Sequence, residues 1–189
     1  MTKPDIRGPV GARRAAHSRF QVVVLCGNPR TGSRTSAAAR AFASALLEAG
    51  EHSASPTVVE LADLGGTVID GGPDVDAAVA AVLAADVLVV ATPVYKASYT
   101  GVLKAFLDRI GGGQLAATVA IPFIVAGAPI HRLAADVHLR PLLVELGAST
   151  PTRAFVIEEA ELPNLHDVIA QWIDAELPKL EGVVRVTRS

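Results

Sequence analysis

Short apolar runs alternate along the chain with longer segments in which apolar residues recur at helical spacing. The runs are rich in β-branched residues, so each is expected to be a strand buried on both faces. Strands are expected at residues 21–26, 57–61, 87–91, 118–126 and 152–157. Helices are expected at about residues 35–49, 74–84, 101–110, 130–146 and 164–180. A loop is expected at 63–73, which holds four glycines.

This alternation of strand and helix predicts the α/β class. Parallel strands joined by helical crossovers place helices on both faces of one sheet, so we expect a doubly wound, five-stranded parallel sheet in a single domain. Its expected span is residues 20–181, followed by a C-terminal tail at 182–189. Ligands of such sheets bind beyond the carboxyl ends of the strands. The loops after the first, third and fourth strands are therefore the places to look for chemistry.

Composition argues against two classes of protein. No apolar run approaches the roughly 18 to 20 residues that a membrane-spanning helix needs, so a soluble protein is expected. The net charge of −2 argues against a nucleic-acid partner.

The charge is unevenly spread. Residues 1–19 hold five of the 17 basic residues and one of the 19 acidic ones. They show no helical or strand period and lack the apolar stretch of a secretory signal. We expect a flexible basic extension there, with an arm that packs on a partner subunit as the alternative.

Cysteine and histidine usage points to no metal site and no disulfide. Cys26 is the one cysteine and ends an apolar run, so it is expected to be an inert core thiol in a cytoplasmic protein. The five histidines are scattered, and the pair on one expected helix, His131 and His138, is expected to face solvent or an interface. Trp172 has apolar neighbours at helical spacing and is expected in the core.

The loop after the first strand, residues 27–36, suits a phosphate. It joins a buried strand to a helix start, where free backbone N–H groups and the helix dipole favour an anion. Its candidate ligands carry a hydroxyl, an amide or a guanidinium group: Asn28, Arg30, Ser33, Thr35 and Ser36. The alternative is an ordinary turn in which Ser33 or Thr35 only caps the helix. The Walker lysine and the dinucleotide G-x-G-x-x-G pattern are both missing, so a triphosphate or a cradled pyrophosphate is not expected.

The loop after the third strand, residues 91–101, offers a surface for a planar ring. Pro93 stiffens it, and Val94 and Tyr95 add an apolar and an aromatic surface. Backbone N–H groups of such a loop can bind the polar edge of a ring while side chains cover its face. Together the two loops predict a ligand with a phosphate at one end and a planar ring at the other.

Both loops resemble those of the NAD(P)H-dependent FMN reductase family. The family pattern G-S-P-R-x-x-S-x-T/S is matched by Gly27, Pro29, Arg30, Ser33 and Thr35. Residues 91–97 and the run to 107–108 look very like the flavin reductases of two-component alkanesulfonate monooxygenases, and the similarity covers roughly residues 20–147.

The resemblance implies a flavodoxin-like fold that binds FMN and takes hydride from NADPH or NADH. It implies that Arg30, Ser33 and Thr35 hold the FMN phosphate and that Gly127 edges the ring. Thr92, Pro93, Val94 and Tyr95 would border the ribityl chain and the ring. It also implies a homodimer or homotetramer, with reduced flavin supplied to a partner monooxygenase. Because the cofactors carry the chemistry, no catalytic side chain is assigned.

The sequence departs from this pattern at two places. Asn28 stands where the family usually has serine, and it keeps a donor for the phosphate. Val137 and His138 stand where the resembled reductases tend to carry an aromatic residue near the flavin, so flavin as released substrate and flavin as prosthetic group both stay open. The alternatives are a quinone or azo-compound reductase with bound FMN, a flavodoxin-type electron carrier, and a non-enzymatic phosphate-binding module.

Overall fold

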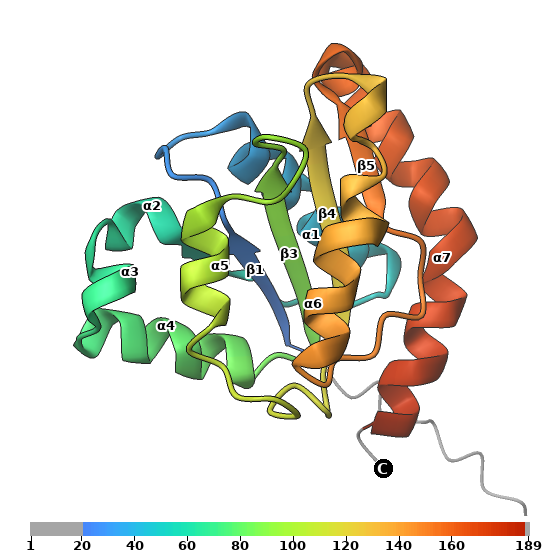
Figure 1. The fold of residues 1–189 in the computed structure, drawn as a ribbon. Coiled ribbons are helices and arrows are strands. Elements are labelled where there is room, and N and C mark those ends of the chain that lie inside the picture. The colour runs from blue at the N-terminus through green and yellow to red at the C-terminus, as the bar shows by residue number, and fades with distance from the viewer. Residues whose placement is uncertain (1–20, 188–189) are drawn as a thin grey trace, which may run out of the picture.

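A computed structural model of the chain describes residues 21–187 as a five-stranded sheet covered by helices on both faces (Figure 1). The strands lie in the order β2-β1-β3-β4-β5, and every neighbouring pair is parallel. Their bounds are β1 Val22–Cys26, β2 Thr57–Glu60, β3 Val87–Pro93, β4 Val119–Ala126 and β5 Phe155–Glu158. The predicted α/β, flavodoxin-like, doubly wound sheet in one domain is confirmed.

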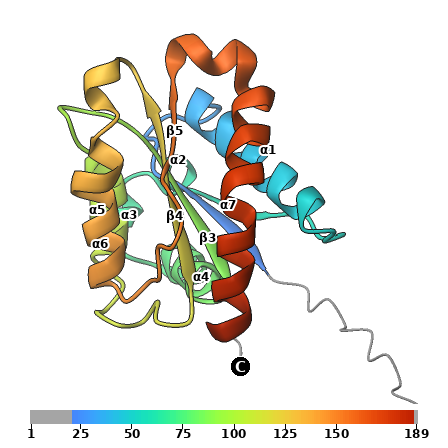
Figure 2. The same cartoon turned by 90° about the vertical axis from the view of Figure 1, so that its right-hand side faces the viewer.

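The helices form two layers (Figure 2). The first helix, α1, and the last, α7, pack against one face of the sheet, and the layer from α2 to α6 packs against the other. The α-helices are α1 Arg34–Ala49, α2 Leu61–Leu64, α3 Thr67–Asp70, α4 Pro73–Leu83, α5 Gly101–Leu107, α6 Arg140–Glu145 and α7 Leu165–Thr187. Three further helical turns are η1 Pro129–His131, η2 Ala135–Leu139 and η3 Glu159–Asn164.

Two segments differ from the sequence expectation. The loop expected at 63–73 contains the end of α2 and all of α3. Arg109 holds α3 by donating to the carbonyls of Val68 and Ile69 at 2.8 and 2.7 Å. The helix expected at 130–146 is divided into η1, the π-helical turn η2 and α6. Pro141 lies in the first turn of α6, where the missing N–H of proline is tolerated.

The C-terminal end also differs. The last helix, expected to end near residue 180, continues to Thr187, so most of the segment expected as a tail is helical. Val184 is buried and packs with the α1 and α7 layer, which explains why the helix continues. The basic extension predicted at 1–19 lies outside the described residues and stays a prediction.

Aromatic packing fastens α1 and α7 to the sheet. The ring of Phe42 lies 5.5 Å from Phe123, 4.8 Å from Phe155 and 4.9 Å from Trp172, measured between centroids. Phe123 and Phe155 stack at 4.6 Å across β4 and β5. Such pairs contribute about 0.5–1.5 kcal/mol each beyond their buried area. The prediction that Trp172 belongs to the core is confirmed.

Two absences hold for the described residues. Within 21–187, no helix is both long and apolar enough to cross a membrane. The same part of the chain holds no cluster of histidine, cysteine and carboxylate side chains that would bind a metal ion.

Candidate functional site

A pocket of about 390 Å³ opens at the carboxyl ends of β1, β3, β4 and β5. Its wall combines the β1–α1 loop with one or two residues from each of the other three strand ends. The lining residues are Asn28, Arg30, Thr31, Gly32, Ser33, Arg34, Thr35, Pro93, Tyr95, Val125 and Glu159. This is the edge of the sheet where ligands of doubly wound folds bind.

The β1–α1 loop is shaped by its own side chains. Asn28 is buried, accepts from the backbone N–H of Arg30 at 2.9 Å and donates to Thr35 Oγ1 at 3.4 Å. Gly32 has a φ of +61°, a conformation that costs a residue with a Cβ roughly 1–2 kcal/mol. The loop is therefore held in a turn that leads the chain straight into α1.

The start of α1 provides backbone donors. Ser33 is the N-cap, and its Oγ accepts from the amide of Ser36 at 3.2 Å. The amides of Arg34 and Thr35, the first two helical residues, have no partner inside the helix. Because α1 is 16 residues long, its dipole adds a partial positive charge at the same place.

Two guanidinium groups add full charges to this end of the pocket. Arg30 and Arg34 are both exposed, so their charges meet an entering ligand in a screened environment. Arg34 Nη2 pairs at 2.8 Å with Oε1 of Glu159, the residue that follows β5. The pocket therefore has two cations and one carboxylate in its wall.

The loop after β3 ends in a tight two-residue turn. Tyr95 and Ser98 exchange backbone hydrogen bonds of 2.8 and 3.1 Å, and Lys96 and Ala97 between them both have positive φ, at 51° and 64°. The turn holds Tyr95 at the pocket with 43% of its surface exposed. An exposed tyrosine on a closed turn is available to cover a flat ligand.

Thr100 ties the two loops together. It is the N-cap of α5, where its hydroxyl accepts from the amide of Leu103 at 3.3 Å and donates to the carbonyl of Gly27. A Cβ at Gly27 would lie 2.7 Å from the Cβ of Leu103, so α5 approaches the loop more closely than any other residue type permits. The β1–α1 loop and the loop after β3 are thus fixed relative to each other.

Six of the ten predicted site residues line this pocket, and four do not. Ser36 donates its hydroxyl to Glu60, and Thr92 is fully buried and donates to the carbonyl of Pro93 at 2.9 Å. Val94 packs against the core, and Gly127 lies on the exposed loop after β4. These four roles stay predictions, and the hydroxyls of Ser36 and Thr92 already have protein partners.

Five lining residues are not among the ten predicted ones. Thr31, Gly32 and Arg34 belong to the predicted loop at 27–36, whereas Val125 and Glu159 lie outside both predicted loops. Val125 lies on β4, and Glu159 directly follows β5. The parallel arrangement was itself the signal for Glu159, because the residue after each strand reaches the same edge of the sheet. Glu159 is one of three glutamates at 158, 159 and 161, and nothing in the sequence distinguishes it from the other two.

Behind the loop lies a buried thiol and a carboxylate. Cys26 is fully buried, and burial raises its pKa to about 11, with the charge of Glu60 acting in the same direction. The thiol therefore stays protonated and poorly nucleophilic at neutral pH. Its predicted position in the core is confirmed.

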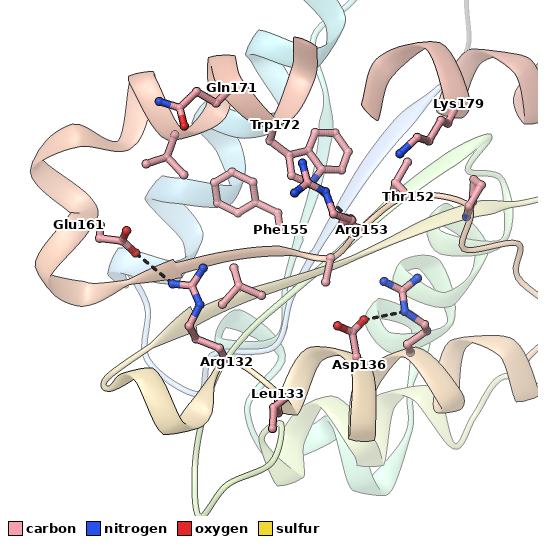
Figure 3. Close-up of a pocket in the computed structure, with 15 residues that line it drawn as sticks. Arg132, Leu133, Asp136, Thr152, Arg153, Phe155, Glu161, Gln171, Trp172 and Lys179 are labelled. Carbon is pink, nitrogen blue, oxygen red and sulfur yellow. Dashed lines mark hydrogen bonds and ion pairs between the residues drawn. The ribbon is translucent and has the colours of Figure 1, made fainter. Parts of the chain in front are cut away.

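A larger hollow of about 730 Å³ lies along the outer edge of β5, between the η2–α6 segment and α7 (Figure 3). Its cations are already matched by acids. Arg132 pairs with Glu161 at 3.4 Å, and Arg140 pairs with Asp136 at 2.8 Å. The 23-residue helix α7 begins at Leu165, which does not line this hollow. A hollow whose cations are already paired and whose lining lacks the start of a long helix is a poor phosphate site, so the smaller pocket is the candidate site.

Comparison with known proteins agrees with this geometry. A family model described as NADPH-dependent FMN reductase matches residues 20–161. An FMN reductase (NADPH) of Escherichia coli strain K12 is 38% identical over 82 residues, which cover 43% of this chain and 43% of that protein. The chain thus spans less than half the length of that relative. An FMN reductase (NADPH) of Pseudomonas aeruginosa is 32% identical over 167 residues, covering 85% of this chain and 88% of that protein.

The fold has a close counterpart among solved structures. The apo form of an NADH:FMN oxidoreductase, EMOB, is 31% identical and superposes with a TM-score of 0.73. The superposition covers 89% of this chain and 88% of that one, so the likeness extends over the whole sheet and its helices.

Proposed function

This chain belongs to the NADPH-dependent FMN reductase family, and from that premise we propose that it transfers hydride from NADPH or NADH to FMN. One observation carries the proposal: a single pocket joins a phosphate-type loop at a helix start to a tyrosine on a closed turn. FMN has a phosphate monoester at one end and a planar ring at the other, so its two ends match the two parts of the wall.

The residues present fit an FMN phosphate. The free amides at the start of α1, the hydroxyls of Thr31 and Ser33 and the guanidinium groups of Arg30 and Arg34 surround the same space. Hydrogen bonds between such groups and an ionised phosphate are the strong, charge-assisted kind. Asn28 holds this loop in shape through Arg30 N and Thr35 Oγ1, so its role is to position the donors.

When bound, FMN supplies the acceptor for the nicotinamide hydride. The chain's own task is to bind and orient. Pro93 and Tyr95 form the side of the pocket next to the phosphate loop, and Thr100 keeps that side at a fixed distance from it. Neither step needs a side chain that accepts or donates a proton, so we assign no catalytic residue. Both NADPH and NADH occur in the names of its relatives, so the proposal includes either as the hydride donor.

We further propose that the chain acts in the cytoplasm as a homodimer or homotetramer and supplies reduced flavin to a partner monooxygenase. Support for assembly comes from four exposed apolar side chains on the segment from η1 to α6: Ile130, Leu133, Val137 and Val144. An exposed apolar patch of this kind is typical of an interaction surface.

The test is NADPH oxidation by flavin-stripped protein at increasing concentrations of free FMN. A rate that saturates while many equivalents of FMN turn over supports a released substrate. The Arg30→Ala variant should then raise the KM for FMN about tenfold, because one charge-assisted contact to the phosphate is lost.

Two other outcomes would change the proposal. Activity that is complete at one equivalent of FMN and then depends on an added quinone would identify a reductase with bound FMN. No oxidation of NADPH or NADH at any FMN concentration would rule out the reductase function and favour an electron carrier or a binding module.

A further inference from the structure

The phosphate end of the pocket contains a carboxylate. Glu159 lines the pocket together with Arg30 and Arg34, and its Oε1 lies 2.8 Å from Arg34 Nη2. The two partners lie 125 residues apart in the chain, so their contact joins the start of α1 to the end of β5. Their side chains are 66% and 43% exposed, for Arg34 and Glu159 respectively.

The position of Glu159 is fixed by the turn that it begins. Glu161 accepts from the backbone N–H of Glu158 at 2.8 Å, which closes the first turn of η3. Arg132, from the segment after β4, donates to Glu158 at 3.0 Å and to Glu161 at 3.4 Å. The backbone of Glu159 is therefore anchored on both sides, and its carboxylate is directed to the pocket by the fold.

A carboxylate at this place opposes the ligand that the rest of the wall attracts. A phosphate monoester carries nearly two negative charges at neutral pH. Glu159 repels that charge and also occupies the guanidinium group of Arg34, which would otherwise be free to turn to the phosphate. Both effects weaken the bound state, and both act on the phosphate alone.

We propose that Glu159 is an affinity-setting residue that weakens the hold on the FMN phosphate and so favours release of the flavin. The inference rests on the proposed function and deepens it, because a flavin that leaves after reduction behaves as a substrate. It also predicts reduced discrimination between FMN and riboflavin, since riboflavin has no phosphate to repel.

The experiment compares the equilibrium binding of FMN and of riboflavin, followed by quenching of flavin fluorescence, in wild type, Glu159→Gln and Glu159→Ala. Both variants should bind FMN about three- to tenfold more tightly, the range expected for one exposed, screened charge near a dianion. Release of FMN, measured by stopped flow, should slow by a similar factor. Riboflavin affinity should stay the same.

The matched control is Glu145→Gln, which removes the same charge from an exposed position on α6, outside the pocket. It should change neither affinity.

If the Glu159 variants bind FMN as wild type does, or less tightly, the inference is overturned. Weaker binding would mean that Glu159 positions Arg34 for the phosphate. If wild type oxidises NADPH with FMN but the Glu159 variants show no gain in FMN affinity, this inference alone is overturned. Wild type that binds neither flavin would overturn the proposed function with it.

Discussion

Glu176 on α7 is a carboxylate with only 1% of its side chain exposed, and it accepts hydrogen bonds from two cations and one backbone amide. It accepts from Arg153 Nε at 2.8 Å, from the amide of Arg153 at 3.1 Å and from Lys179 Nζ at 2.9 Å. Burial acts to raise its pKa, but the hydrogen bonds from Lys179 and Arg153 outweigh it, so the pKa of Glu176 is lowered. The residue joins α7 to the segment that leads into β5.

Glu176→Gln should lower the free energy of unfolding by about 1–2 kcal/mol at pH 7, because two partly exposed cations and one backbone amide lose a charged acceptor. A lowered pKa in the folded state stabilises the protein above the ordinary glutamate value of 4.5, and this contribution is lost as the pH falls through the lowered value. In urea unfolding, the difference in free energy of unfolding between wild type and Glu176→Gln should therefore become smaller below about pH 4.5. A gap that is the same at low and neutral pH would contradict this account.

Among the pocket residues, the sequence identified those of the β1–α1 loop, which are close together in the chain, better than those contributed by the ends of other strands. Asn28, Arg30, Ser33 and Thr35 follow one strand within eight positions, and all line the pocket. Ser36 belongs to the same stretch, yet its hydroxyl turns to Glu60 on β2. Spacing along the chain identifies which residues are near a helix start but leaves the direction of each side chain to the packing around it.

Among the structural elements, the turn between Tyr95 and Ser98 has the least favourable backbone. A two-residue hairpin loop with positive φ at both positions prefers Asn-Gly, whereas this chain has Lys96 and Ala97 there. An alanine in the left-handed conformation costs roughly 1 kcal/mol relative to glycine, so Ala97 lowers the free energy of unfolding of the protein.

Ala97→Gly should raise the free energy of unfolding by about 0.5–1 kcal/mol, since the gain in the turn exceeds the added flexibility of the unfolded chain. Chemical denaturation measures the change. Ala105→Gly inside α5 is the matched control and should lower the stability by about 1 kcal/mol. A loss of stability in Ala97→Gly as large as in the control would show that the turn is not strained.

The strands were predictable and the helices only in part. Each of the five apolar runs identified one strand. In the middle of the sheet, β1, β3 and β4 are buried on both faces as expected, whereas β2 and β5 lie at its edges and are buried only in part, so the expectation of full burial is wrong for these two. The segment from about 130 to 146 was predicted as one helix, whereas the structure inserts a π-helical turn at Ala135–Leu139. One additional residue in a turn shifts the pattern too little to be recognised in a short segment.

At the scale of the whole molecule, the exposed apolar side chains before α6 predict a surface for assembly into an oligomer. Leu133 and Val137 expose 69% and 58% of their surface on neighbouring turns before α6. If this segment lies between subunits, Leu133→Asp combined with Val137→Asp should reduce the mass measured by sedimentation to that of one chain. Such a change places charges into an interface that excludes water.

Ile69→Asp serves as the control for that variant, because Ile69 is 76% exposed on α3 and belongs to a different surface. It should leave the sedimentation unchanged. A double variant that sediments as wild type does would exclude this surface from the assembly.

The position of the one tryptophan has a spectroscopic consequence. Trp172 lies in the α1 and α7 layer, edge-on to Phe42 and with its ring N–H on the carbonyl of Arg153 at 3.3 Å. Tyr99 packs against the core on the opposite face of the sheet. Tryptophan emission therefore reports the loosening of the layer formed by α1 and α7, and not of the layer on the side of Tyr99, without an added dye.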